Sequence, residues 1–337
     1  MGIHSFGVEV VDVGVIRFAE VIRAGKMSGL RYLKFVAYQS LSLEGGGVLG
    51  EALTHADASL NFLEEVLLLY QIDAVTAAFL EGLSRGTGRL PALHTLHCTH
   101  GRTIGTDGAQ SLSALVSGGR VPSLKDLKVR LGGIGQEGMQ PFAASLNSPH
   151  VFALRKLFVE IGQVAPANAA VEVGLFSAAF SSGHLCRLEE LCVGGLCVIE
   201  EVRALCVGLG SGGLSSLRTL QLSACRLGVE GGRALSEVVV AEKLPSLRIL
   251  EAERTGLADE GVRALVEVWM TRDPPPLQHL GFSNTALTIG VVNPLLQFLG
   301  SQRLHAPETV SLSDNWSIDQ ASKDSLLGAF PEAVKFC

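Results

Sequence analysis

Apolar residues recur along the whole chain in one repeated arrangement. Three segments, residues 121–146, 214–239 and 244–269, align without gaps. Each reads apolar-x-x-Leu-x-x-Leu-x-apolar, followed by a bend and then by apolar residues at helical spacing. Alternating apolar positions predict a short strand, and apolar residues three and four apart predict an amphipathic helix. The repeated unit is therefore predicted to be a strand, a turn and a helix.

The third apolar position of each unit, called the anchor below, occurs ten times. Successive anchors lie 29 to 34 residues apart, with a mean of about 31. The anchors are Leu33, Val66, Leu96, Leu127, Leu157, Leu191, Leu220, Leu250, Leu280 and Val310. A strand and a helix each have one apolar face that neither can bury alone, so neighbouring units must stack. The pattern predicts an α/β solenoid of about ten repeats, with a parallel sheet on the inner side and helices on the outer side.

The unit around residue 220 has the fullest motif, with Leu217, Leu220, Leu222, Cys225 and Leu227. This pattern resembles the leucine-rich repeats of the ribonuclease-inhibitor-like subtype, Leu-x-x-Leu-x-Leu-x-x-(Asn/Cys)-x-Leu followed by a helix. The resemblance extends from about residue 27 to about residue 330. It implies a horseshoe with the sheet on its concave face and the helices on its convex face. It says little about function, because one fold can support many functions.

The two ends depart from the repeat. Residues 1–26 hold a helical pattern and predict a partial repeat that caps the stack, and residues 27–321 predict the solenoid itself. Residues 322–337 predict a closing helix. Inside the solenoid, the stretch Val164–Asn168 delays the expected helix and makes that repeat irregular. Neither end is a strong polar cap, which leaves open a longer parent chain or a partner that covers an end.

Composition narrows the function classes. The 337 residues are 47% hydrophobic and 18% charged, which excludes a disordered chain. The net charge of −6, from 27 basic and 33 acidic residues, gives no field for a polyanion, so nucleic acid is not expected as a partner. Neither a membrane-inserted segment nor a signal peptide is expected. Seven cysteines without framework spacing indicate buried, reduced thiols in the cytoplasm or another reducing intracellular compartment.

Two sequence motifs could carry chemistry. Gly-x-Gly-x-x-Gly occurs three times, but every unit here runs strand, turn, helix, so that context adds no evidence for a nucleotide. His94, His97 and His100 form the densest histidine cluster, yet a spacing of three on a strand puts side chains on opposite faces. Metal binding by this cluster is left open. The chain is predicted to be no enzyme, with no catalytic residue, cofactor or metal.

The concave face is the predicted binding site for a protein partner. Residues on either side of each anchor, and three and four positions beyond it, are expected to line this face. In the first half of the chain these include several large apolar side chains, which is typical of a protein interface. The predicted partner-binding residues are Tyr32, Val36, Leu67, Leu69, Tyr70, His97, His100, Lys128, Arg130, Leu131, Lys156, Phe158 and Ile161.

The favoured function is a non-catalytic protein-interaction scaffold, acting as a subunit of a larger assembly. One alternative is that an N-terminal segment or a long loop of the chain itself covers the apolar residues. Resemblance to the repeat subtype adds a second alternative, a GTPase-activating protein for a small GTPase, although the C-terminal sequence lacks the acidic run of those proteins. A third alternative is the substrate-binding half of a ubiquitin-ligase adaptor.

Overall fold

The structure is a computed structural model that describes residues 5–6, 12–36, 41–69, 73–99, 103–131, 133–161, 169–301 and 309–336. It divides into two compact units, Met1–Val164 and Ala165–Cys337, called the N-terminal and C-terminal units below. The division falls within the irregular stretch that the sequence singled out. The boundaries predicted at residues 26/27 and 321/322 stay a prediction.

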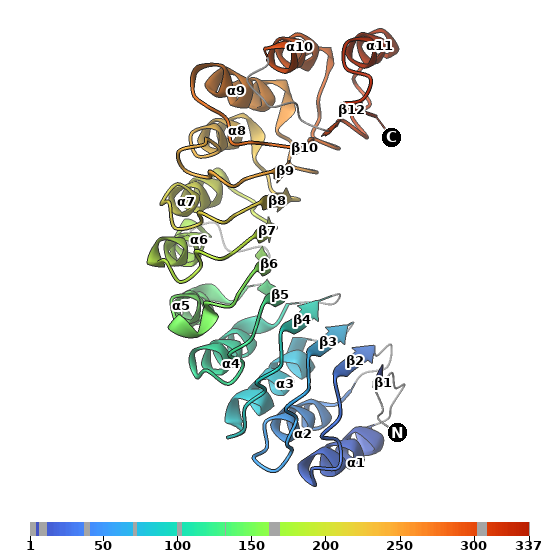
Figure 1. The fold of residues 1–337 in the computed structure, drawn as a ribbon, viewed down its shortest axis with the longest axis vertical. Helices are drawn as coiled ribbons and strands as arrows, with labels where there is room; N and C mark the ends of the chain where they lie inside the picture. Colours follow the sequence, from blue (N-terminus) through green and yellow to red (C-terminus); the bar gives the residue numbers. More distant parts are fainter. Residues whose placement is uncertain are drawn as a thin grey trace. The chain divides into compact units, whose positions relative to one another are not determined.

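The N-terminal unit is a parallel sheet with helices along one side of it (Figure 1). Its strands pair in chain order and are β1 (Ser5–Phe6), β2 (Tyr32–Val36), β3 (Glu65–Leu69), β4 (Thr95–Thr99), β5 (Asp126–Leu131) and β6 (Lys156–Ile161). Its helices are α1 (Asp12–Arg23), α2 (Leu43–Leu53), α3 (Asp73–Arg85), α4 (Gly105–Ser117) and α5 (Gly135–Leu146), with a 3₁₀ turn at Pro149–Val151.

The C-terminal unit repeats this plan with shorter strands. The strands are β7 (Glu190–Gly194), β8 (Thr219–Ser223), β9 (Ile249–Glu251), β10 (His279–Gly281), β11 (Thr309–Ser311) and β12 (Val334–Lys335). The helices are α6 (Ala169–Ala178), α7 (Ile199–Leu209), α8 (Gly228–Ser236), α9 (Ala258–Thr271), α10 (Val292–Gly300) and α11 (Gln320–Ala329), with 3₁₀ turns at Ala179–Ser182 and Ile289–Val291.

The ten anchors confirm the predicted register. Each is the second residue of its strand, and each is buried. In the N-terminal unit the anchors from Leu33 to Leu157 pair with one another strand by strand, and in the C-terminal unit those from Leu191 to Val310 do the same. These two rows of apolar side chains lie between sheet and helices and form the centre of each core. The predicted α/β repeat architecture is thereby confirmed.

The two ends differ from expectation. Short strands that the sequence analysis did not foresee, β1 and β12, extend the sheets beyond the first and last anchors. The closing helix lies at Gln320–Ala329 and does not fill residues 322–337. It ends at Phe330, whose φ of −139° is not helical, because the following Pro331 disfavours a helical conformation in the residue before it. The chain then turns into β12.

Two glycines set how closely α2 and α3 approach. A Cβ atom added to Gly50 would lie 2.1 Å from the Phe79 carbonyl oxygen, and one added to Gly82 would lie 2.2 Å from the Gly47 carbonyl oxygen. No real Cβ atom tolerates such distances, so any side chain at these positions would force the helices apart. The two helix backbones are therefore in direct contact.

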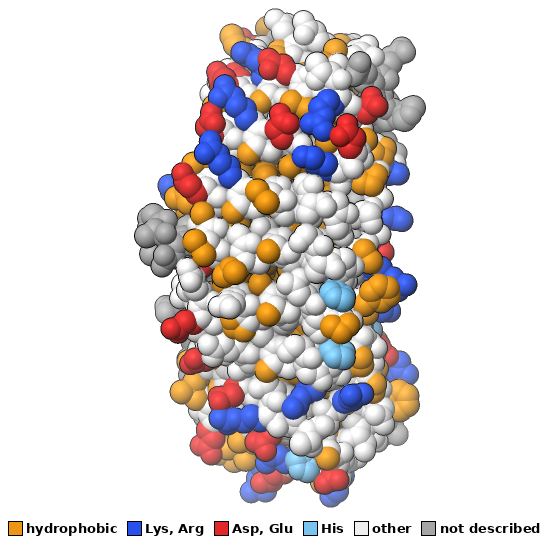
Figure 2. All heavy atoms as spheres, turned by 90° about the vertical axis from the view of Figure 1, so that its left-hand side faces the viewer, with side chains coloured by type: hydrophobic (Ala, Val, Ile, Leu, Met, Phe, Trp, Pro, Cys, Tyr) orange, Lys and Arg blue, Asp and Glu red, His pale blue; other side chains and the backbone are white. Residues whose placement is uncertain are grey.

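Several charges on the helix side of the C-terminal unit are paired with one another. Arg272 contacts Glu237 at 3.3 Å and Glu242 at 3.0 Å, and Arg233 contacts Glu230 at 2.5 Å. Figure 2 shows the helix side, and red and blue side chains stand next to each other in its upper part. Such exposed pairs contribute little stability.

Candidate functional site

The sheet of the N-terminal unit has a face turned away from the core, called the sheet face below. Side chains alternate along each strand, so every second residue of β2 to β6 lies on this face. The strand register places five of these residues in one line across neighbouring strands, called the central row below. Its members are Lys34, Leu67, His97, Lys128 and Phe158.

The central row mixes apolar and basic groups. Leu67 lies between Lys34 and His97, and Phe158 lies next to Lys128. Both Leu67 and Phe158 are half-buried. Three strand spacings separate them, roughly 14 Å at about 4.8 Å per strand. The apolar residues that the sequence grouped together are therefore two separate anchoring points with basic side chains between them.

Some charges on this face are paired and others are not. His97 Nε2 lies 3.0 Å from Asp126 Oδ1, and Arg130 pairs with Glu160. Lys34 and Lys128, by contrast, form no ion pair with any residue that the structure describes. An exposed ammonium group without an internal partner is available to a carboxylate of another molecule. The central row thus offers two positive charges that no described residue compensates.

Tyr32 lies at the edge of the same face, in the neighbouring row. Its ring is 37% exposed, and its hydroxyl donates a 3.1 Å hydrogen bond to Glu64, whose carboxylate also pairs with Arg31 at 2.7 Å. The Glu64 carboxylate raises the pKa of Tyr32, because it accepts the hydroxyl's hydrogen bond and repels a phenolate. The ring is therefore held in one orientation.

Two of the predicted face residues are wrong. Leu131 and Ile161 are 0% and 1% exposed and belong to the core. The reason is that β5 and β6 keep their alternation for six residues, so the position four beyond the anchor returns to the buried side. Leu69 and Lys156 do lie on the sheet face. Tyr70, His100 and the side chain of Val36 lie outside the described residues.

The cysteines behave as structural thiols. Cys98, Cys206 and Cys225 are buried, and burial raises the pKa of each thiol to about 12. A thiol with such a pKa is neither a nucleophile nor a ready metal ligand at neutral pH. Among the residues that the structure describes, no group of three or more His, Cys, Asp or Glu side chains could hold a metal ion. His94 instead contacts the Thr95 hydroxyl at 3.0 Å.

Trp316 is an exposed aromatic residue that the sequence analysis did not identify. Trp316, in the turn after β11, is 85% exposed and lines a pocket at the edge of the C-terminal unit. The sequence did carry a signal, since Trp316 is one of only two tryptophans and stands in a turn where the motif needs no large side chain.

Comparison with known proteins agrees with this architecture. A family model described as Leucine Rich repeat matches residues 213–236, which span the end of the α7–β8 connection, β8 and α8. The chain has a leucine-rich-repeat fold. Its fold class is the α/β leucine-rich-repeat solenoid, with parallel strands on one side of each unit and helices on the other.

One solved structure supports the fold, and a second is reported for its likeness only. A chain from the crystal structure of the Rad7 and Elc1 complex in yeast is 15% identical, with a TM-score of 0.54, covering 99% of this chain and 75% of that chain. A protein from Bacteroides fragilis is 14% identical, with a TM-score of 0.38, covering 64% of this chain and 66% of that chain. At such identities the likeness concerns the fold alone.

Two further comparisons are brief. No curated protein sequence matches this chain. Within the part of the chain that the structure describes, no helix is both long and apolar enough to cross a membrane.

Proposed function

We propose that this chain is a non-catalytic scaffold that binds a protein partner on the sheet face of its N-terminal unit, as a subunit of a larger assembly. The observation that carries the proposal is the central row. Leu67 and Phe158 offer two apolar contacts, and Lys34 and Lys128 lack an ion-pair partner among the described residues. A surface that combines apolar side chains, which a partner can bury, with uncompensated charges is typical of a protein interface.

The chemistry of the row defines the partner. It should present apolar side chains to Leu67 and Phe158 and carboxylates to the two lysines. A nucleic acid fits poorly, because Glu65, Asp126 and Glu160 share the face and would repel a phosphate backbone. The proposal therefore specifies an acidic protein surface with at least one exposed apolar residue.

The finer classification is also a proposal. The described part of the C-terminal unit has α-helices of nine to fourteen residues between its strands, and Cys225 is fully buried at the Asn/Cys position of the motif. Both features favour the ribonuclease-inhibitor-like subtype. The six cysteines that the structure describes are all free thiols, which favours a reducing intracellular compartment.

The proposal is tested by affinity capture from the source cell with three forms of the chain. These are the wild type, the double variant Leu67→Asp and Phe158→Asp, and the matched control Val207→Asp, which places the same charge at a 76% exposed valine on α7. The double variant should lose its partner by at least about 30-fold in affinity, the effect of removing a hot spot. Circular dichroism melts of all three forms check that they are folded.

The outcomes separate the candidates. Retention of the same partner by the folded double variant would count against the sheet face, as would its loss from Val207→Asp. GTP hydrolysis by candidate small GTPases, measured with and without the chain, tests the alternative. Acceleration of hydrolysis would replace the scaffold proposal with GTPase activation.

A further inference from the structure

One edge of the C-terminal unit carries a regular row of left-handed residues, called the turn row below. Ala224, Arg254, Asn284 and Asp314 have φ between +53° and +57° and follow one another at intervals of 30 residues. Each stands in the turn that follows one of the strands β8 to β11. Because they share one backbone conformation at one position of the repeat, their side chains leave the backbone in the same direction.

Hydrogen bonds between repeats hold this row in place. The backbone N–H groups of Ala224, Arg254 and Asn284 donate to the carbonyl oxygens of Glu253, Ser283 and Ser313, at 3.1, 3.1 and 2.9 Å. Each acceptor is the residue just before the next member of the row. The turns are therefore tied to one another, and the side chains they carry are presented by a fixed backbone.

The last turn is fixed from beneath by Asn315, which is 4% exposed. Its side-chain oxygen accepts hydrogen bonds from the backbone N–H groups of Thr285 and Leu287, both at 3.0 Å, and its amide nitrogen donates to the carbonyl oxygens of Phe282 and Leu312 at 2.8 and 3.0 Å. Trp316 is the next residue. Its large exposed ring is thus attached to backbone that is already ordered, so binding through it costs little conformational entropy.

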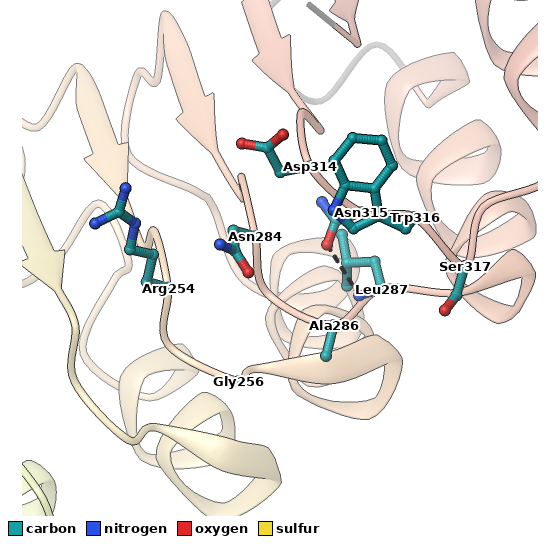
Figure 3. A pocket seen from close by; sticks show the side chains of 9 residues that line it. All are labelled: Arg254, Gly256, Asn284, Ala286, Leu287, Asp314, Asn315, Trp316 and Ser317. Carbon is teal, nitrogen blue, oxygen red and sulfur yellow. Dashed lines mark hydrogen bonds between the residues drawn. The ribbon is translucent and has the colours of Figure 1, made fainter.

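The last three members of the turn row and Trp316 border one pocket, shown in Figure 3. The pocket has a volume of about 370 Å³, within the range of small binding pockets, about 300–1,000 Å³. Arg254 lies at one end, Asn284 between, and Asp314 and Trp316 at the other end. Neither Arg254 nor Asp314 forms an ion pair with any residue that the structure describes.

We propose that this pocket binds an extended segment of a partner protein, with an arginine of that segment seated between Trp316 and Asp314. A guanidinium group stacks on an aromatic face and bonds a carboxylate in two places, so one side chain satisfies both residues. An anion would be repelled by Asp314, and a purely apolar group would leave that carboxylate without a counterion.

The spacing of the turn row defines the second feature of the segment. Arg254 and Asp314 lie two strands apart, roughly 10 Å at about 4.8 Å per strand. A segment in the polyproline II conformation rises about 3.1 Å per residue and has three residues per turn, so a carboxylate three residues from the arginine lies on the same side of the segment and reaches Arg254. Asn284, between them, can bond the backbone of the segment through its amide group. The recognised pattern is therefore an arginine and an acidic residue three positions apart, and this site is independent of the central row.

Indole N–H signals in ¹H–¹⁵N NMR spectra of the full chain provide the test. The chain has two tryptophans, and Trp269 is a built-in control, because it is buried and its Nε1–H bonds the Val239 carbonyl oxygen at 2.7 Å. The probes are blocked hexapeptides with the cores Arg-Ala-Ala-Glu and Glu-Ala-Ala-Arg, and a neutral peptide with Gln in place of both charged residues. Titration should move the Trp316 signal saturably with one or both charged probes and leave the Trp269 signal unchanged.

Two variants assign the contacts. Asp314→Asn keeps a residue type that tolerates a φ of +57°, and Arg254→Gln removes the other charge. Each should weaken binding of the charged probe about three- to fivefold, the size of an exposed ion pair, with the Trp269 signal reporting an intact fold. An equal shift with the neutral probe, no shift with any probe, or a Trp316 signal that moves on dilution without probe would each overturn the proposal, the last by assigning Trp316 to self-association.

Discussion

The sheet faces of the two units use the same backbone in different ways. In the C-terminal unit, polar side chains bond one another across strands: the Gln221 amide donates to Glu251 at 2.6 Å, and His279 contacts the Thr309 hydroxyl at 3.0 Å. Ser283 and Ser311 form a third such contact at 3.0 Å. Groups that satisfy each other have little left to offer a partner, because a partner must first replace those bonds.

The sheet face of the N-terminal unit carries apolar and charged side chains that are available to a partner. Its central row holds Leu67 and Phe158 half-buried and two lysines without an ion pair among the described residues. The comparison teaches that the repeat itself does not define a binding surface. A binding surface arises where the outward side chains of neighbouring strands do not satisfy one another's hydrogen bonds and charges.

The units also differ in their buried polar groups. In the described part of the N-terminal unit these are hydroxyl side chains, such as Thr54 and Ser113. The C-terminal unit buries three carboxylates, on Glu172, Glu201 and Asp259. Burial raises the pKa of the Glu172 carboxyl, so a pH effect on stability is expected in the C-terminal unit.

The largest expected effect separates core from face. Leu220→Asp puts a carboxylate at a fully buried anchor and should lower the free energy of unfolding by about 4 kcal/mol or more. Leu67→Asp makes the same change on the sheet face and should cost under about 1 kcal/mol. Urea denaturation of both variants measures the difference. Equal losses would show that the assigned strand register is incorrect.

A smaller loss of stability is expected on substitution of Asn315, whose side chain forms hydrogen bonds with backbone groups near the turn after β11. Asn315→Ala leaves the N–H groups of Thr285 and Leu287 and the Phe282 carbonyl oxygen without this partner, and should cost about 2–3 kcal/mol. Thermal unfolding followed by circular dichroism measures the loss. The control is Asn284→Ala, at an exposed position of the turn row, for which we expect a loss of about 1 kcal/mol or less. A similar loss in both would contradict the role assigned to Asn315.

The smallest effect concerns pH and should raise stability. Burial raises the pKa of Glu172 above its ordinary value of 4.5, with the nearby Glu201 carboxylate adding to the shift, and Glu172 Oε2 has no hydrogen-bond partner among the residues that the structure describes. The folded state then holds a proton that the unfolded state releases, so stability is full below pH 4.5 and is lost as pH rises through the raised pKa. Glu172→Gln should remove that loss and melt at a higher temperature than wild type at pH 7.

The pH series supplies the contrast. The difference between Glu172→Gln and wild type should shrink toward pH 4, where Glu172 is protonated in both states. Glu201→Gln should instead destabilise, because the Glu201 carboxylate accepts hydrogen bonds from the backbone N–H groups of Cys197 and Val198 at 2.5 and 3.0 Å. A melting difference for Glu172→Gln that does not change with pH would rule out the titration account.

The fold was predictable because the anchors report burial directly. An apolar residue at the second position of these short strands points into the core between sheet and helices, and all ten anchors are buried there. The ends were harder. Two-residue strands such as β1 and β12 carry no alternation of their own, and their pairing depends on the neighbouring strand.

The candidate site was predicted less well, for two physical reasons. Leu131 and Ile161 were placed on the face because the sequence does not show where a strand stops alternating. The ion pairs between neighbouring strands could not be predicted from the sequence either. His97 with Asp126, and Arg130 with Glu160, are neighbours across strands some thirty residues apart, so which lysines remain free became visible only from the register.

The contact between α2 and α3 has a consequence for the opposite side of the N-terminal unit. Strand spacing in a sheet is nearly constant at about 4.8 Å, whereas packed helices usually stand about 8–10 Å apart, and this mismatch bends a stack of repeats. Where Gly50 and Gly82 let the helix backbones touch, the mismatch is smaller, so we expect the sheet to bend less at β2 and β3. Gly50 and Gly82 lie on the helix side, where a partner bound to the sheet face would not contact them. We therefore expect these two glycines to influence the shape of the surface around Leu67.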